Sequence, residues 1–177
     1  MDIFWAELTA GLPDTRELVR VMIRLIAATL LGAVVGIERE RAGKPAGLRT
    51  HILVTLGTTV FVLACSGVGM SLDGVSRVIQ GIATGIGFIG AGAILKLTEE
   101  RDIQGLTTAA GIWMTAALGV AVGLGSLGVA LLSTLLTLLI LAAVGSLEYR
   151  IGKRRAAKAE DSNQRAGARH DRDGGAT

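Results

Sequence analysis

Five long apolar runs constrain this sequence more than any other feature. A hydrocarbon core about 30 Å thick needs roughly 20 consecutive apolar residues to be crossed by a helix, and five segments approach that length. They are Leu18–Ile37, His51–Val68, Arg77–Leu97, Leu106–Leu124 and Leu127–Leu147. The predicted fold class is therefore all-α, an integral membrane bundle of five transmembrane helices spanning residues 18–147.

Two short segments flank the predicted bundle. Residues 1–17 do not resemble a cleavable signal peptide, because acidic Asp2 and Glu7 stand where a basic region is expected. Asp14 followed by Glu17 predicts a capping box that opens the first helix. The tail, residues 148–177, is rich in Ala, Gly and charge and is predicted to be disordered. Its basic start, residues 150–158, is interpreted as an anchor at anionic headgroups, with a protein-binding arm as the alternative.

The basic residues predict an orientation in a bacterial inner (plasma) membrane. Fourteen of the 18 Lys and Arg residues fall on one predicted side. They are Arg39, Arg41, Lys44 and Arg49 after the first span, Lys96 and Arg101 after the third, and eight in the tail. Since short cytoplasmic loops carry the excess of Lys and Arg, the N-terminus is predicted outside and the C-terminus in the cytoplasm.

The charge and the cysteine count exclude several function classes. The formal net charge of +3 comes from the tail, so the basic pI gives no support for nucleic-acid binding. One cysteine, Cys65, allows no internal disulfide, and two histidines, His51 and His170, suggest no zinc site. No cofactor or metal is predicted. An enzyme is not predicted either, because the sequence offers no nucleophile–base–acid set and no phosphate loop.

Glycine, at 25 of 177 residues, marks predicted helix-packing faces. Glycines four residues apart let helix backbones approach closely in lipid. Such pairs are Gly32 and Gly36, Gly81 and Gly85, and Gly119 and Gly123. The third span has small residues on two opposite faces, one with Gly81, Gly85 and Gly92 and one with Ala83, Gly87 and Gly90. This pattern predicts that the Gly-rich third helix lies centrally in the bundle. A local break in GIGFIGAG (85–92), lining a cavity, is the alternative.

Polar residues within the spans are candidates for function because they are costly in lipid. Arg24 on the first helix either reaches the outer interface or turns inward to a partner such as Asp73 or Gln80. No Asp or Glu lies near the centre of any span. A pathway that dehydrates a divalent cation usually needs carboxylate oxygens, so this absence weighs against such a pathway.

Three polar segments meet the predicted cytoplasmic side: GIERE (36–40), PAGLRTH (45–51) and GLTTAA (105–110). Helix N-termini present unpaired N–H groups and a positive dipole end. The starts of the second and fourth spans are therefore expected to hold an anion or a carboxylate. Glu38 or Glu40, clamped by Arg49 in bidentate fashion, are the internal candidates. The cluster either locks the loop structurally or forms a ligand or partner site.

Four stretches resemble the MgtC/SapB family of bacterial inner-membrane proteins, in order and at the family's spacing. They are LLGAVVGIERE (30–40), AGLRTHILVTLG (46–57), the stretch from Asp73 to GIGFIGAGAIL (73–95) and GLTTAAGIW (105–113). The residues that match the family pattern are Glu38, Arg39, Gly47, Arg49, Thr50, His51, Asp73, Arg77, Gln80, Gly85, Gly87, Gly90, Gly92, Gly105, Thr107 and Thr108. MgtC-type members continue into a folded C-terminal domain, whereas this chain resembles the short, membrane-only type.

The resemblance implies a non-enzymatic membrane protein that acts on other membrane proteins in adaptation to low magnesium or stress. The expected partners are the lipid bilayer and either a second copy of the chain or another integral membrane protein. The predicted cytoplasmic cluster consists of Glu38, Arg39, Arg49, Thr50, His51, Thr107 and Thr108. The alternative function is an ion or small-solute transporter or channel subunit, whose outer gate would use the cluster Arg24, Asp73, Arg77 and Gln80.

Overall fold

The computed structural model describes residues 3–4, 14–95, 105–143 and 145. Every described element is a helix, and none of these residues forms a strand. The helices are α2 (Thr15–Arg41), α3 (Leu48–Gly67), α4 (Leu72–Leu95), α5 (Leu106–Gly123) and a last helix, Leu127–Ala143. The chain divides into residues 1–137 and 138–177, and the packing described below is that of the first unit. The predictions that rest on Asp2 and Glu7 and on the tail, residues 148–177, lie outside the described residues.

The five predicted spans correspond to these five helices. Helices α2 to α5 are each long and apolar enough to cross a membrane, by length and composition. The N-cap bond of the predicted capping box is observed at α2, where the Glu17 amide donates to Asp14 Oδ1 at 2.8 Å. α4 begins earlier than predicted, at Leu72, because the Ser71 hydroxyl accepts from the Gly74 amide and supports a polar first turn.

Small and polar residues repeat at every fourth position along three helices and form the contact faces of the bundle. These positions are Ala28, Gly32 and Gly36 on α2, His51, Thr55 and Thr59 on α3, and Gly111, Thr115, Gly119 and Gly123 on α5, all of them buried. Residues four apart share a helix face, and rows of this spacing interdigitate when helices pack. The result is a tight α2–α3–α5 core.

The packing predicted for two glycine pairs is observed in this core. A Cβ added to Gly32 would lie 2.6 Å from Thr55 Oγ1 and 2.8 Å from the His51 carbonyl oxygen. A Cβ added to Gly119 would overlap Thr58 Oγ1 and the Thr55 carbonyl oxygen. Glycine at these positions therefore lets α2 and α5 approach the backbone of α3.

Most threonine hydroxyl groups donate a hydrogen bond to a backbone carbonyl of their own helix, as expected for threonines in a membrane span. Thr55 donates to the His51 carbonyl at 2.7 Å and Thr58 to the Val54 carbonyl at 2.8 Å. Thr59 is different, because its hydroxyl crosses to the Gly119 carbonyl of α5 at 2.9 Å. This interhelical bond fixes the register of α3 against α5.

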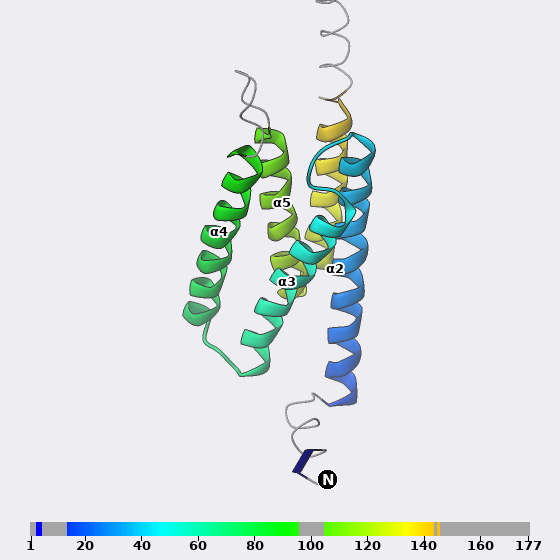
Figure 1. Cartoon of the computed structure of the whole chain (residues 1–177). Coiled ribbons are helices and arrows are strands. Elements are labelled where there is room, and N and C mark those ends of the chain that lie inside the picture. Colours follow the sequence, from blue (N-terminus) through cyan, green and yellow to red (C-terminus); the bar gives the residue numbers. More distant parts are fainter. Residues whose placement is uncertain (1–2, 5–13, 96–104, 144, 146–177) are drawn as a thin grey trace, which may run out of the picture. The chain divides into compact units, whose positions relative to one another are not determined.

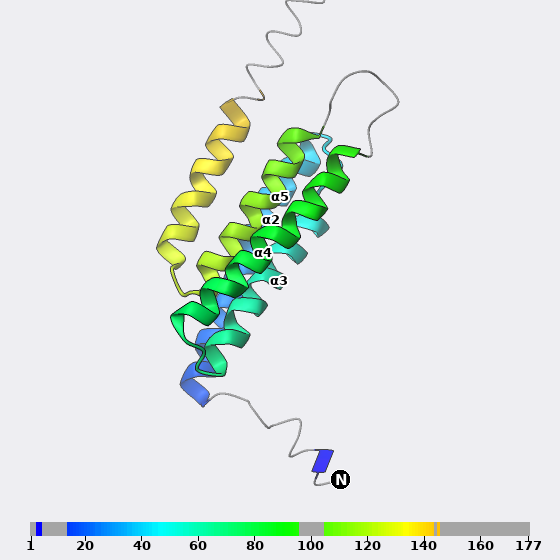
Figure 2. The same cartoon turned by 90° about the vertical axis from the view of Figure 1, so that its left-hand side faces the viewer.

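The central placement of the third span is wrong for the described bundle. α4 packs against α5 and α3 but not against α2, whereas α5 contacts α2, α3 and α4. Figure 1 shows α4 at the edge of the bundle, and in Figure 2, seen from that side, α4 runs along the front. The alternative, a local break within residues 85–92, is not observed either, because α4 is continuous from Leu72 to Leu95. The central helix is α5.

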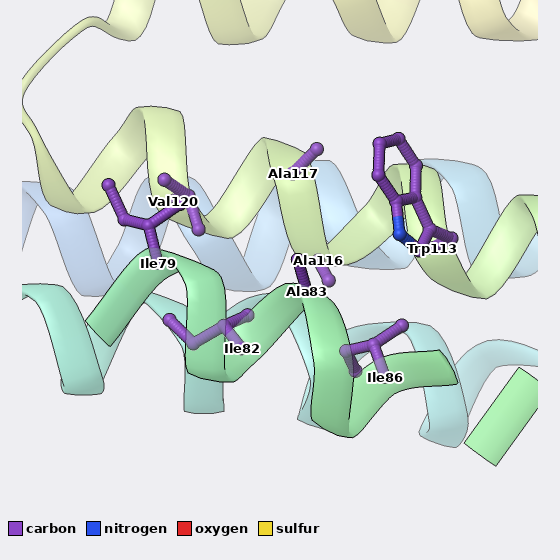
Figure 3. A pocket seen from close by; sticks show the side chains of 8 residues that line it. All are labelled: Ile79, Ile82, Ala83, Ile86, Trp113, Ala116, Ala117 and Val120. Atoms are coloured by element: carbon purple, nitrogen blue, oxygen red, sulfur yellow. The ribbon is translucent and has the colours of Figure 1, made fainter. Parts of the chain in front are cut away.

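Of the five glycines on the two small faces of α4, only Gly90 has a described neighbour within 4 Å of an added Cβ. Ile79, Ile82 and Ile86 face α5, where Ala116 and Ala117 leave a pocket of about 160 Å³ (Figure 3). Gly90, on the same side, packs against Ala109 of α5 at 3.5 Å from its missing Cβ. For the other predicted packing glycines of α4, no described atom lies within 4 Å of an added Cβ; they are Gly81, Gly85, Gly87 and Gly92.

Candidate functional site

A cluster of polar side chains lies where α2 ends and α3 and α5 begin. We call it the polar junction and define it as Glu38, Arg39, Glu40, His51 and Thr115. Arg39 is only 3% exposed, and its guanidinium makes two bonds to the Glu38 carboxylate, one from Nε and one from Nη2 at 2.8 Å. This bidentate pairing offsets the cost of burying the arginine charge.

His51 joins the junction to α5. It is fully buried, and its Nδ1 lies 2.7 Å from Thr115 Oγ1. The Thr115 hydroxyl also lies 2.8 Å from the Gly111 carbonyl, so it links the imidazole of α3 to the backbone of α5. The other ring nitrogen, Nε2, is buried and has no hydrogen-bond partner among the described residues.

Gly111 provides the space in which the three helices meet. A Cβ added there would lie 3.7 Å from His51 Cε1 and 4.0 Å from Arg39 Cδ. The imidazole and the aliphatic part of the arginine therefore both pack against the backbone of α5. Side chains from α2 and α3 share this one position on α5.

Glu40 caps the next helix. The N-cap of α3 is Gly47, which has no side chain to cap with. Glu40 Oε2 instead accepts from the Leu48 amide at 2.9 Å. A carboxylate at this end also interacts favourably with the helix dipole. The predicted carboxylate at the start of this helix is thus observed, and it comes from Glu40.

The predicted clamp by Arg49 is wrong. Arg49 is exposed, and no described carboxylate pairs with it. Arg39 takes the role instead, because it is adjacent to Glu38 on the same helix and is buried against Gly111 of α5. Of the other residues predicted for this cluster, Thr108 is buried, Thr50 is partly buried and Thr107 is exposed.

The predicted outer cluster does not assemble around Arg24. The guanidinium Nη1 of Arg24 donates to the Gly123 carbonyl at 2.9 Å, at the end of α5. Asp73, Arg77 and Gln80 are exposed on α4. Among the described residues none of them forms a hydrogen bond or ion pair with Arg24, because α2 and α4 do not pack together.

In the part of the chain that the structure describes, the geometry of these residues is that of a structural junction between three helices. Within the ranges that the structure describes, no three His, Cys, Asp or Glu residues are grouped so as to hold a metal ion. Cys65, the one thiol, is buried and donates to the Phe61 carbonyl, as expected for a packed thiol. Thr115 and Gly111 were not predicted as members of the site. Their four-residue spacing with Gly119 and Gly123 is the sequence signal that marks them.

Comparison with known proteins gives the family. Residues 25–150, which include the whole polar junction, match the MgtC family. The chain belongs to this family. Together with four long apolar helices, membership of the MgtC family identifies a multi-pass membrane protein.

Three relatives show how much of the chain is shared. The chain is 43% identical to the protein SrpB of Synechococcus elongatus over 136 residues. This aligned region covers 71% of this chain and 75% of SrpB. The chain is 42% identical over 138 residues to the putative magnesium transporter YhiD of Escherichia coli, and the aligned region covers 73% of this chain and 63% of YhiD. It is 44% identical over 117 residues to the protein MgtC of Salmonella typhimurium, 66% of this chain and 49% of MgtC. No solved structure matches the chain.

Proposed function

We propose that this chain is a non-enzymatic protein of the bacterial inner membrane that modulates other integral membrane proteins in adaptation to low magnesium or stress. Membership of the MgtC family supports the membrane setting, and the similarity to YhiD, a putative magnesium transporter, supports the link to magnesium. The observation that carries the regulatory part of the proposal is an open groove between α3 and α4.

The groove is apolar and has a volume of about 580 Å³. It is lined by Thr58 and Phe61 of α3 and by Val78, Gly81, Ile82, Gly85, Ile86 and Ile89 of α4. Phe61 is 61% exposed, and added Cβ atoms on Gly81 and Gly85 would meet no described atom within 4 Å. This surface has the small residues of a packing face without a described helix against it.

Small residues matter because lipid tails are as apolar as side chains, so helices associate in a membrane through close van der Waals contact. The buried stripe Gly111, Thr115, Gly119 and Gly123 illustrates such contact inside this bundle. The same spacing at Gly81 and Gly85 supports docking of a transmembrane helix from another integral membrane protein.

Magnesium-linked transport is the second candidate, favoured by the similarity to YhiD, a putative magnesium transporter. The chain offers little for such transport. α3 and α5 contain no Asp or Glu, and the acidic residues of α2 and α4 lie near helix ends, at Glu17, Glu38, Glu40 and Asp73. Divalent cations are held by oxygen ligands, usually including carboxylates.

Photocrosslinking in the living membrane tests the regulatory proposal. A photoreactive phenylalanine analogue at Phe61 faces the groove, and the same analogue at Leu30, 60% exposed on α2, is the matched control. We expect a discrete protein adduct from position 61 under magnesium limitation and none from position 30. Gly85→Leu, which fills the groove, should remove the adduct at position 61.

Proteoliposomes test the alternative. Protein reconstituted with a magnesium-sensitive dye inside the vesicles should give no Mg²⁺ entry above that of empty vesicles. Mg²⁺ entry that depends on the protein and disappears in Gly85→Leu, together with no adduct at position 61, would replace the regulatory proposal with transport.

A further inference from the structure

A second cavity lies at the opposite end of the bundle from the polar junction, where α2 begins and α3 and α5 end. Its volume is about 860 Å³. One wall is apolar, with Leu63, Ala64 and Val68 of the α3 end and Leu124 after α5. The wall on α2 is charged, with Glu17, Arg20 and Arg24. A cavity with these two walls suits an amphiphilic ligand.

Arg24 is held in place by the end of α5. Its Nη1 donates to the Gly123 carbonyl at 2.9 Å, and its Nη2 would lie 2.5 Å from a Cβ on Gly125. Gly125 has φ +83°, so the turn after α5 both favours glycine and leaves room for the guanidinium. The positive charge lies at the negative end of the α5 dipole. A guanidinium has five N–H donors, and among the described residues Arg24 uses one of them.

Arg20 lies one helical turn before Arg24 on the same side of α2 and lines the same cavity. It is exposed and makes no hydrogen bond or ion pair with the described residues. Glu17 is not within ion-pair distance of either arginine. Two arginines and one glutamate give this wall a formal charge of +1.

The position of the arginines along α2 matches the edge of a membrane. With a rise of 1.5 Å per residue, Arg20 and Arg24 lie roughly 7.5 and 13.5 Å along the axis from Thr15. Arginines at such depths extend toward the headgroups. A phosphate at headgroup level can accept from both guanidiniums, since arginine matches phosphate geometry with paired N–H groups. The apolar wall then contacts the attached acyl chain.

We propose that this cavity binds one anionic phospholipid, with its phosphate between Arg20 and Arg24 and an acyl chain along Leu63, Ala64 and Val68. The +1 charge favours a lipid of net charge −1 over a zwitterionic one. The apolar wall favours a lipid over free phosphate, which would gain nothing from Leu63 and Val68. The site is separate from the α3–α4 groove of the proposed function and does not depend on it.

The test measures lipid binding to the purified full chain in a neutral detergent by native mass spectrometry. Phosphatidylglycerol and phosphatidylcholine of identical chain length are added separately, and inorganic phosphate is added in a third arm. The variant is Arg20→Gln, which should keep the fold because Arg20 holds no intramolecular bond among the described residues. Arg16→Gln is the matched control, since Arg16 is exposed on the same helix and does not line the cavity.

We expect one tightly retained phosphatidylglycerol per protein molecule, weaker retention of phosphatidylcholine and no effect of inorganic phosphate on thermal stability. Losing one charged hydrogen-bonding partner should weaken phosphatidylglycerol binding about tenfold in Arg20→Gln and leave it unchanged in Arg16→Gln. Equal retention of the two lipids, equal loss in both variants, or stabilisation by inorganic phosphate alone would each overturn the proposal.

Discussion

His51 Nδ1 and the hydroxyl of Thr115 form a hydrogen bond of 2.7 Å across the α3–α5 interface. The Thr115 hydroxyl also lies within hydrogen-bond distance of the Gly111 carbonyl, so the three groups form one chain. In a dry interior such a chain has a large effect on stability, because any broken member leaves a buried polar atom without a partner. The polar junction therefore stabilises the packing of α3 against α5.

Replacing Thr115 by Val removes the hydrogen-bond partner of His51 Nδ1 while keeping the shape of the side chain. We expect the free energy of unfolding in detergent micelles to fall by about 1–3 kcal/mol, the cost of an unpaired buried polar atom. Denaturant titration measures this change. The control is Thr84→Val, since the Thr84 hydroxyl bonds only its own helix, at the Gln80 carbonyl, on the exposed face of α4. Equal losses in both variants would contradict the role of the His51 contact.

The ion pair between Glu38 and Arg39 gives a second prediction. Glu38→Gln removes the charge that balances a guanidinium with a side chain only 4% exposed. The amide oxygen keeps one acceptor, so we expect a loss of stability on the order of 2–3 kcal/mol. Arg49→Gln, a change at an exposed arginine of the same region, should leave the unfolding free energy unchanged. A Glu38→Gln protein as stable as the wild type would show that the pair contributes nothing net.

The sequence was sufficient to predict the helices and part of their packing. Apolar run length predicts spans directly, because the bilayer imposes one length scale. Four-residue glycine spacing correctly identified Gly32, Gly36, Gly119 and Gly123 as close contacts. The polar first turn of α4 was missed because Asp73 and Ser76 lower the local hydropathy, although Ser71 supports the helix start.

The errors share a physical cause, since a pattern on one helix does not reveal which neighbour meets it. Gly81 and Gly85 show that one face of α4 consists of small residues. Whether another helix covers that face depends on how α3 and α5 are arranged. The hydrogen-bond partner of Arg24 could not be predicted either. It is the backbone carbonyl of Gly123, and every residue has such a carbonyl, whatever its side chain. The pairing of Arg39 with Glu38 is not evident from the sequence either, because adjacent residues on a helix seldom face each other.

The predicted orientation can be tested by labelling single cysteines. Cys65 is replaced by Ser, and one new cysteine is placed at Lys44, after α2, or at Ser71, before α4, both of which are exposed. With the N-terminus outside, a membrane-impermeant maleimide should label position 71 in intact spheroplasts and position 44 only after lysis. The opposite pattern would show that the Lys and Arg asymmetry does not set this topology.

Two glycines in helices of the same bundle, Gly119 and Gly81, differ in the space that an added methyl group would find. Gly119→Ala places a methyl group against the Thr55 carbonyl and the Thr58 hydroxyl, and the backbone atom has no flexible end that could move aside. We expect this change to separate α5 from α3 and to destabilise the protein by about 1–3 kcal/mol or more. Gly81→Ala meets no described atom within 4 Å, and alanine favours a helix over glycine by about 1 kcal/mol. It should therefore be neutral or stabilising in detergent, as thermal unfolding of the two variants side by side would show. If Gly81→Ala instead destabilised the purified protein as much as Gly119→Ala, the α4 face would already be covered in solution, and a second copy of the chain would be the first occupant to test.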